Sequence, residues 1–570
     1  MEKIKKHEKV SYAGLHSLAD VLENCMAKYA NYDAITDKYN NISLTYGELR
    51  EEMNLFASGL QALGVKKGDK VGIFAESNGL WMATSLAIQK CGAVDVIRGS
   101  NAPIEELHYI TAHSDCKGVI LRDDKLFNAM KPFLQKYRLD FVIITYSAGN
   151  VDTTDVRSKV YTHKDIINLG KENKFIPVAM QRDDDCSILY TSGTTGNPKG
   201  VLLSHENSIY QLEIVHEGFL AQPGENTLQI LPIWHAYERI GQCYYISRGC
   251  HLHYTTLSGL KNDLANYDID TFMSVPRIWE SIRLGVYQKL KQTSPILHDI
   301  FDFAVKTSIA YKTHKMYGER RITNKWSYNA LSTIRHRVIR SFYKPLHVLF
   351  SKTLYKKIKK AVGLSNIRAS ISGGGALSMQ DELFYDAIGV NLRIGYGLTE
   401  TAPVLTLRNV RDKNFLGSAG SPLIGTDLKI VDPKTFRELP VFSKAASSWR
   451  FDDNSDSLID AQGWILGSTK RNKNIVSFKQ TELEKNNNIH LYDDKYALID
   501  SPQDIINILN LEESKSKKIE YYLGLDIGGT VSYFTGNIEE GVASTSTSKE
   551  DAAKVYVEKD KQKQDYGKEK

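Results

Sequence analysis

Hydrophobic positions along the first 150 residues follow two alternating spacings, and each spacing indicates one kind of element. Apolar residues recur at helical spacing through Leu49–Leu63 and Trp81–Gln89. Between them lie short runs of consecutive apolar residues, at Val71–Phe74, Gly118–Leu121 and Phe141–Thr145. Such runs are typical of strands that are buried on both faces. The alternation predicts an α/β fold in which helices cover both faces of parallel sheets.

The segment from residue 283 to residue 360 differs from the rest of the chain in pattern and in charge. It reads as helical and holds 18 Lys and Arg residues against three acidic ones, a net charge of +15. The whole chain carries only +6, so the other residues sum to −9. Apolar residues such as Phe342 and Leu349 lie among the cations. Basic helices with an apolar side suit an anionic membrane surface, where each Lys or Arg contributes about 1 kcal/mol.

We therefore predict peripheral contact with an anionic membrane through residues 283–360. An ordinary solvated helical surface is the alternative, since it also concentrates charge and needs no partner. Nucleic acid is not expected as a partner, because the sequence contains no recognisable RNA- or DNA-binding motif.

Composition narrows the class of protein further. Of 570 residues, 42% are hydrophobic and 25% are charged, which is the balance of a folded globular protein. No apolar run is long enough to span a bilayer, and the charged start leads into no apolar segment. We therefore expect neither a transmembrane helix nor a secretory signal. The six cysteines include no CxxC pair, which argues against a disulfide scaffold or zinc ribbon and favours a cytoplasmic protein.

The clearest chemical signal is the loop LYTSGTTGNPKGV at Leu189–Val201. Its glycines allow backbone N–H groups to turn toward an anion, its hydroxyls add donors, and its lysine supplies a positive charge. This composition predicts a phosphate-binding loop. It is not a Walker A loop, because Lys199 is followed by Gly200 and a strand pattern instead of a helix. We expect the loop to connect two strands, with Ser204 as the N-cap of the next helix.

This loop and four motifs after it resemble the signatures of the adenylate-forming superfamily, which includes acyl-CoA synthetases. The four are LPIWHAYER (Leu231–Arg239), VPRIWE (Val275–Glu280), SGGGAL (Ser372–Leu377) and GYGLTET (Gly395–Thr401). The first two, and the basic helical insert that follows them, are similar to long-chain fatty acyl-CoA synthetases. The resemblance implies an α/β adenylation domain of helix-covered sheets over residues 1–440. Residues 441–570 would form a small, degenerate α+β remnant of the C-terminal domain, with a charged tail.

The resemblance also implies a nucleotide site. The loop would hold the phosphates of ATP through Thr191, Ser192, Gly193, Thr194, Thr195, Gly196 and Lys199. Thr191 and Glu400 would lie near Mg²⁺, which prefers hard oxygen ligands, and Thr399 would contact the α-phosphate. The residues expected around the adenine are Gly374, Gly375, Ala376, Tyr396 and Gly397.

Two residues of LPIWHAYER are assigned to the acyl side by the same resemblance. His235 would orient the reacting carboxylate, and Trp234 would act as a gate at the mouth of the acyl tunnel. Lys199, His235, Thr399 and Glu400 are thus the expected catalytic residues. Glu238 and Arg239 are expected to form a structural ion pair.

The C-terminal part departs from the family pattern. SWRFDD (Ser448–Asp453) is a degraded likeness of the stretch whose aspartate binds the ribose hydroxyls, so Asp453 is the ribose candidate, with a solvated turn carboxylate as the alternative. We find no convincing counterpart of the adenylating lysine loop. YLGLDIGGT (Tyr522–Thr530) resembles the phosphate hairpin of actin-like ATPases, but too few residues follow it to form such a fold, and we expect either a fragment left by a fusion or a simple β-hairpin.

Together these features predict an acid–thiol ligase that uses ATP, Mg²⁺ and CoA to convert a long-chain fatty acid to acyl-adenylate and then acyl-CoA. Two alternatives stay open. One is a pseudoenzyme that binds ATP or fatty acid without turnover, and the other is a ligase that loads an acyl carrier protein. The expected location is cytoplasmic, with a peripheral position on the inner face of the membrane.

Overall fold

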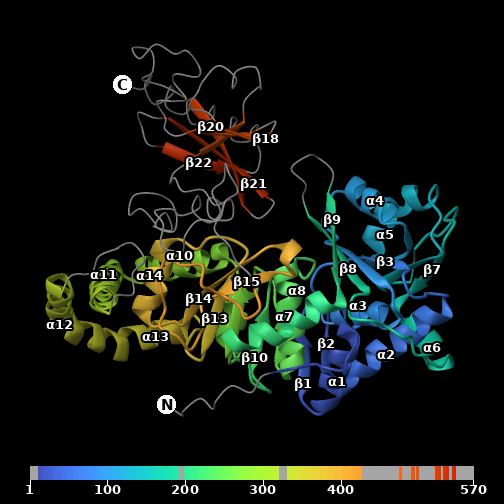
Figure 1. Ribbon diagram of the computed structural model, residues 1–570, viewed down its shortest axis with the longest axis horizontal. Helices are drawn as coiled ribbons and strands as arrows, with labels where there is room; N and C mark the ends of the chain where they lie inside the picture. Colours follow the sequence, from blue (N-terminus) through green and yellow to red (C-terminus); the bar gives the residue numbers. More distant parts are fainter. Residues whose placement is uncertain are drawn as a thin grey trace. The chain divides into compact units, whose positions relative to one another are not determined.

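The computed structural model describes residues 10–149, 151–191, 198–319 and 330–426, together with short strands between Asn474 and Ser546 (Figure 1). The chain divides into two compact units. The first comprises Met1–Arg321, Asn329–Gly374 and Gln380–Thr426; the second comprises Ile322–Tyr328, Gly375–Met379 and Asp427–Lys570. The first unit contains both large sheets.

One large sheet has seven strands in the order β7-β6-β5-β3-β4-β8-β9. Neighbouring strands are parallel except β8 and β9, which are antiparallel. The predicted apolar runs all lie in this sheet. Its strands are β3 (Lys70–Phe74), β4 (Val94–Arg98), β5 (Cys116–Asp123), β6 (Phe141–Tyr146), β7 (Lys159–Thr162), β8 (Asp185–Thr191) and β9 (Lys199–Ser204).

The strands of this sheet other than the edge strand β9 contribute to two cores, because successive side chains point to opposite faces. Ile120 and Ile143 pack into one core, and their neighbours Val119 and Val142 pack into the other. Helices cover both faces, as the sequence pattern predicts (Figure 1). The helices are α2 (Tyr46–Ala62) and α3 (Trp81–Lys90) on the first face, and α4 (Ile104–His113) and α5 (Asp124–Leu134) on the second.

The other large sheet has nine strands in the order β16-β15-β14-β13-β12-β10-β11-β1-β2. Its strands are β1 (Asp33–Asp37), β2 (Ile42–Thr45), β10 (Asn226–Gln229), β11 (His251–Tyr254), β12 (Thr271–Ser274), β13 (Ala369–Ser372), β14 (Leu392–Gly397), β15 (Val404–Leu407) and β16 (Ser421–Pro422). The prediction of parallel sheets is right for the centre and wrong for the edges, where β2, β15 and β16 are antiparallel to their neighbours. Short connections join β1 to β2 and β14 to β15, and a short connection can only return the chain in the opposite direction.

The described part of the basic segment is mostly helical, as predicted, with breaks at Ser294 and Thr353. It forms the end of α10 (Pro276–Thr293), then α11 (Pro295–Gly318), α12 (Ala330–Lys352) and most of α13 (Leu354–Ala361). Helices α11 and α12 pack together, with the rings of Phe303 and Phe350 edge to face at 6.3 Å. Among the described residues, no helix combines the length and apolarity that crossing a membrane requires.

Beyond Thr426 the structure describes two small sheets. One contains β17 (Asn474–Ser477), β18 (His490–Asp493) and β19 (Tyr496–Ile499), and the other β20 (Glu520–Ile527), β21 (Thr530–Asn537) and β22 (Val542–Ser546). Strands β20 and β21 are antiparallel, with Ile527 opposite Thr530, so the backbone at this point pairs as a β-hairpin does. Asp453 lies outside the described residues, as does most of the predicted C-terminal remnant.

Candidate functional site

The predicted phosphate loop lies at the end of a two-stranded hairpin. Strands β8 and β9 pair so that Thr191 stands opposite Lys199, and the Thr191 hydroxyl donates to the Lys199 carbonyl at 3.4 Å. The prediction that two strands flank this loop is therefore confirmed. So is the predicted N-cap, because Ser204 Oγ accepts from the backbone of Asn207 at 3.3 Å at the start of α7 (His205–Gly218). The loop residues Ser192, Gly193, Thr194, Thr195 and Gly196 lie outside the described residues.

The hairpin lies next to the turn that carries the predicted Mg²⁺ and α-phosphate ligands. This turn is the short 3-10 helix η1 (Thr399–Thr401), which contacts β9. Lys199 and Glu400 are both exposed, and neither forms an ion pair with any residue that the structure describes. No group of three or more His, Cys, Asp or Glu side chains in the described parts could hold a metal by itself. A single free carboxylate beside a phosphate loop fits Mg²⁺ that is shared with nucleotide phosphates.

A buried glutamine, which sequence reasoning missed, connects the hairpin to this turn. Gln211 lies on α7, directly after β9, and is only 3% exposed. Its side-chain amide donates to the carbonyl of Val404 and accepts from the backbone N–H of Val404, both at 3.1 Å. It also donates to the carbonyl of Thr401 at 3.4 Å. These bonds hold the turn that carries Glu400 against the helix that begins at the phosphate hairpin.

The adenine-side residues of the first unit lie at the ends of β13 and β14. Tyr396 stands opposite Thr406 on β15, and burial raises the pKa of its phenol to about 12. A Cβ at Gly397 would lie 1.8 Å from the carbonyl oxygen of Pro403, so only glycine fits there. Gly374, which follows β13, has a φ of +70°. Gly375 and Ala376 come next in the chain and belong to the second compact unit.

His235 and Trp234 lie just before α8 (Ala236–Arg248), in a loop that Ser77 holds in place. The Ser77 hydroxyl donates to the carbonyl of Leu231 at 2.7 Å and accepts from the backbone of Ile233 at 2.9 Å. The rings of Trp234 and His235 lie 4.0 Å apart. His235 is an exposed residue, yet the protein atoms around its imidazole lower its pKa, with Arg98 adding a smaller effect. This shift favours the neutral form of the imidazole.

The acyl-side helix α8 reaches the adenine-side turn through Tyr237. A Cβ at Gly373 would lie 2.9 Å from the ring of Tyr237, so the tyrosine packs directly against this glycine. The Tyr237 hydroxyl donates to the carbonyl of Ile371 at 3.4 Å. The helix that follows His235 is thereby held next to the turn that carries Gly374.

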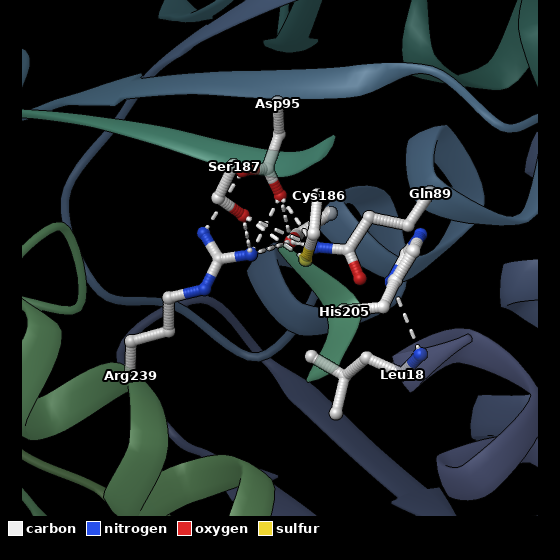
Figure 2. Close-up of polar contacts among 8 residues, drawn as sticks. Leu18, Gln89, Asp95, Cys186, Ser187, His205 and Arg239 are labelled. Atoms are coloured by element: carbon white, nitrogen blue, oxygen red, sulfur yellow. Dashed lines mark hydrogen bonds and ion pairs between the residues drawn. The ribbon is translucent and has the colours of Figure 1, made fainter. Parts of the chain in front are cut away.

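The predicted ion pair between Glu238 and Arg239 is wrong. Arg239 donates from both terminal nitrogens to Asp95 of β4, at 3.0 and 2.8 Å, and to Ser187 of β8 at 2.6 Å (Figure 2). Glu238 is 2% exposed and accepts from Gln242 at 2.8 Å. Burial raises the pKa of Glu238 to about 8. Adjacent residues of a helix point in different directions, so these two side chains enter different parts of the interior.

Comparison with known proteins identifies relatives of this chain. The chain is 36% identical over 453 residues to a chloroplastic long-chain-fatty-acid–acyl-carrier-protein ligase of Arabidopsis thaliana, covering 75% of this chain and 61% of that protein. It is 25% identical over 415 residues to a long-chain-fatty-acid–CoA ligase of Schizosaccharomyces pombe, covering 70% and 57%. The chain thus spans about three fifths of the length of these relatives.

Solved structures show the same fold. The crystal structure of a long-chain-fatty-acid–CoA ligase from Archaeoglobus fulgidus aligns with a TM-score of 0.55 at 18% identity, covering 77% of this chain and 76% of that one. Residues 22–444, well over half of the chain, match the family described as AMP-binding enzyme. Within the first unit, β9 contacts η1 and Tyr237 packs against Gly373. The chain belongs to the AMP-binding enzyme family, as its motifs predicted.

Proposed function

We propose that this protein activates a long-chain fatty acid with ATP, forming an acyl-adenylate and pyrophosphate, and then passes the acyl group to a thiol. The observation that carries the proposal is the contact between β9 and η1, which places the strand of Lys199 beside the turn of Thr399 and Glu400. The names of the relatives, a fatty acid–acyl-carrier-protein ligase and a fatty acid–CoA ligase, support the same reaction. The boundary between an adenylation domain at 1–440 and a C-terminal domain at 441–570 is part of this proposal.

Bound Mg-ATP would supply the electrophilic α-phosphorus and the pyrophosphate leaving group. Among this chain's own residues, Lys199 offers a positive charge, Thr191 a hydroxyl and Glu400 a carboxylate, which is a suitable set for phosphates and Mg²⁺. Preorganised charges of this kind stabilise charge that develops during phosphoryl transfer. The lowered pKa of His235 favours the neutral imidazole, which would donate one hydrogen bond to the fatty acid carboxylate without becoming its counter-ion. The carboxylate then keeps the charge that it needs as a nucleophile.

Fatty-acid-dependent exchange of pyrophosphate into ATP tests the first half-reaction. We expect exchange that requires both Mg²⁺ and a long-chain fatty acid. Nucleotide binding without any exchange would favour the pseudoenzyme alternative and overturn the proposed reaction. Acyl-thioester formation should be measured on the same preparation. The sequence departs from the family pattern beyond Pro440, in the domain that builds the thiol site in this family.

The thiol acceptor has two candidates, CoA and acyl carrier protein. CoA is the acceptor implied by the motif forms and by the name of the relative at 25% identity. The carrier protein is favoured by the relative at 36% identity, which is named for it. To distinguish them, each acceptor is supplied separately to a preparation that forms acyl-adenylate. The acyl-thioester product is then measured.

We also propose peripheral membrane contact through the basic helices, and α12 is the element that supports it. Six apolar side chains recur at helical spacing along one face of α12 and are 40–79% exposed: Leu331, Ile334, Val338, Phe342, Leu346 and Leu349. At 1.5 Å per residue this stripe is about 27 Å long. Exposed cations of the same helix, Arg335 and Lys352, fall on or beside this face at 3.6 residues per turn. An apolar stripe bordered by cations suits an anionic lipid surface, from which a fatty acid substrate could be drawn.

A further inference from the structure

The surroundings of Trp234 suggest how its movement is controlled. We propose that Glu76 and Arg98 form a latch that holds Trp234 against His235, an inference that rests on the proposed function and on the gate position that the family resemblance implies for Trp234. Both latch residues lie at the carboxyl ends of adjacent strands, Glu76 just after β3 and Arg98 as the last residue of β4. Trp234 comes from the loop between β10 and α8, so the latch joins one sheet to a loop of the other.

Glu76 forms the first half of the latch. Its Oε2 accepts from the indole N–H of Trp234 at 3.4 Å. Its Oε1 accepts from the hydroxyl of Ser100 and the backbone N–H of Asn101, both at 3.3 Å. These two bonds fix the carboxylate in place, so the indole meets an acceptor that is already oriented.

Arg98 forms the second half of the latch. Its guanidinium carbon lies 4.7 Å from the centre of the Trp234 ring system, in the range of a cation–π contact. Glu106 holds the guanidinium at 2.7 Å, and the Arg98 side chain is only 15% exposed. The cation is therefore fixed over the ring by a partner on α4 and does not depend on Trp234 for its position.

Gly99, the residue after Arg98, lets the indole come this close. A Cβ there would lie 2.4 Å from Nε1 of Trp234 and 2.9 Å from Oε1 of Glu76. The backbone is thus in direct contact with the ring at this point, and a methyl group would push the indole out of the latch. Gly99→Ala is consequently a second, independent way to open it.

The latch sets the fraction of molecules in which Trp234 has moved away. When a ligand enters only the open form, its apparent affinity falls by the fraction of molecules that are open. Weakening either half should raise this fraction and speed the entry of fatty acid. ATP should be unaffected, because no latch residue lies in the phosphate hairpin or in η1.

The test is stopped-flow binding of a fluorescent long-chain fatty acid to the full chain, with ATP affinity measured in parallel. Glu76→Gln, Arg98→Lys and Gly99→Ala should each raise the association rate constant about three- to tenfold. Arg98→Lys keeps the charge and loses the planar face. Arg122→Lys, at an exposed arginine beside Asp123, is the matched control and should bind like the wild type.

A double-mutant cycle with Trp234→Phe identifies the partner of Glu76. Phenylalanine keeps an aromatic ring and removes the N–H, so Glu76→Gln should have no further effect in that background. Equal effects of Glu76→Gln in both backgrounds, unchanged association in all three variants, or an equal change in ATP affinity would each overturn the latch. If the wild type binds no fatty acid at all, the proposed function fails and the latch with it.

Discussion

Arg239 and Asp95, 144 residues apart in the chain, form a two-point ion pair in the interior, with N–O distances of 3.0 and 2.8 Å. Their side chains are 7% and 0% exposed. Ser85, Gln89 and Ser187 complete the network around them (Figure 2). Charges at this depth are tolerated because hydrogen bonds satisfy both groups. The pair fixes α8, which follows His235, to the strands β4 and β8, and β8 leads into the phosphate hairpin.

Removing one partner should therefore be costly. Arg239→Met keeps much of the side-chain volume and leaves Asp95 buried without its counter-ion, for which we expect a loss of about 3–5 kcal/mol in the free energy of unfolding. Urea denaturation measures it. Arg50→Met is the matched control, because Arg50 is 45% exposed in its ion pair with Glu23 and such pairs contribute about 0–1 kcal/mol. If both variants lose the same free energy of unfolding, the buried ion pair stabilises the protein no more than the exposed pair does.

Lys199 and Glu400 should matter for chemistry and not for stability, because both are exposed and unpaired within the described residues. Lys199→Ala and Glu400→Ala should each lower the rate of pyrophosphate exchange about 10²–10³-fold, as is typical when one group that stabilises developing charge is lost. Their thermal midpoints should match the wild type. Lys261→Ala, at an exposed lysine of α9 (Leu260–Asn266), serves as the control. If Glu400→Ala leaves Mg-ATP binding and exchange unchanged, the site is wrongly assigned.

Acid should destabilise the fold partly through His205. Its Nδ1 accepts from the backbone N–H of Leu18 at 3.1 Å, and burial lowers its pKa to about 4. The unfolded chain binds a proton near pH 6.5 and the folded chain does not, so this contribution to stability is complete above pH 6.5 and is lost as the pH falls toward 4. We expect His205 alone to account for about 2 kcal/mol between pH 7 and pH 5.

Urea denaturation at the two pH values checks this, with His205→Asn as the comparison. Asparagine offers the backbone N–H of Leu18 an acceptor that does not titrate. The loss of stability between pH 7 and pH 5 should therefore be smaller in this variant by the roughly 2 kcal/mol expected of His205. His253, whose pKa burial lowers to about 3, acts in the same direction and remains in the variant. An unchanged slope in His205→Asn would contradict the assignment.

Membrane binding should depend on the exposed stripe of α12 and on salt. The wild type should float with anionic vesicles and be released at high ionic strength, since exposed charges are screened over about 8 Å at physiological salt. Phe342→Asp places a negative charge in the stripe and should abolish flotation. Leu257→Asp is the matched control, because Leu257 is 75% exposed and Phe342 is 77% exposed. Equal retention on neutral and anionic vesicles would exclude the electrostatic interpretation.

Local patterns in the sequence determined much of this protein. Runs such as Phe141–Thr145 predicted strands of the seven-stranded sheet, and the loop composition predicted the hairpin between Thr191 and Lys199. Ser204 was recognisable as an N-cap. These features depend on neighbours within a few positions, so periodicity, glycine content and capping chemistry are enough to reveal them.

Only the tertiary structure decided the partners of the buried polar groups. Glu238 and Arg239 are adjacent in the sequence, yet the guanidinium of Arg239 pairs with Asp95. Nothing near Gln211 or Glu76 in the chain indicates that one holds the turn of Glu400 and the other meets Trp234. A buried polar group pairs with the complementary donor or acceptor that packing of the sheets and helices brings within hydrogen-bonding distance. Sequence spacing carries no information about the distance between two such groups in the folded protein.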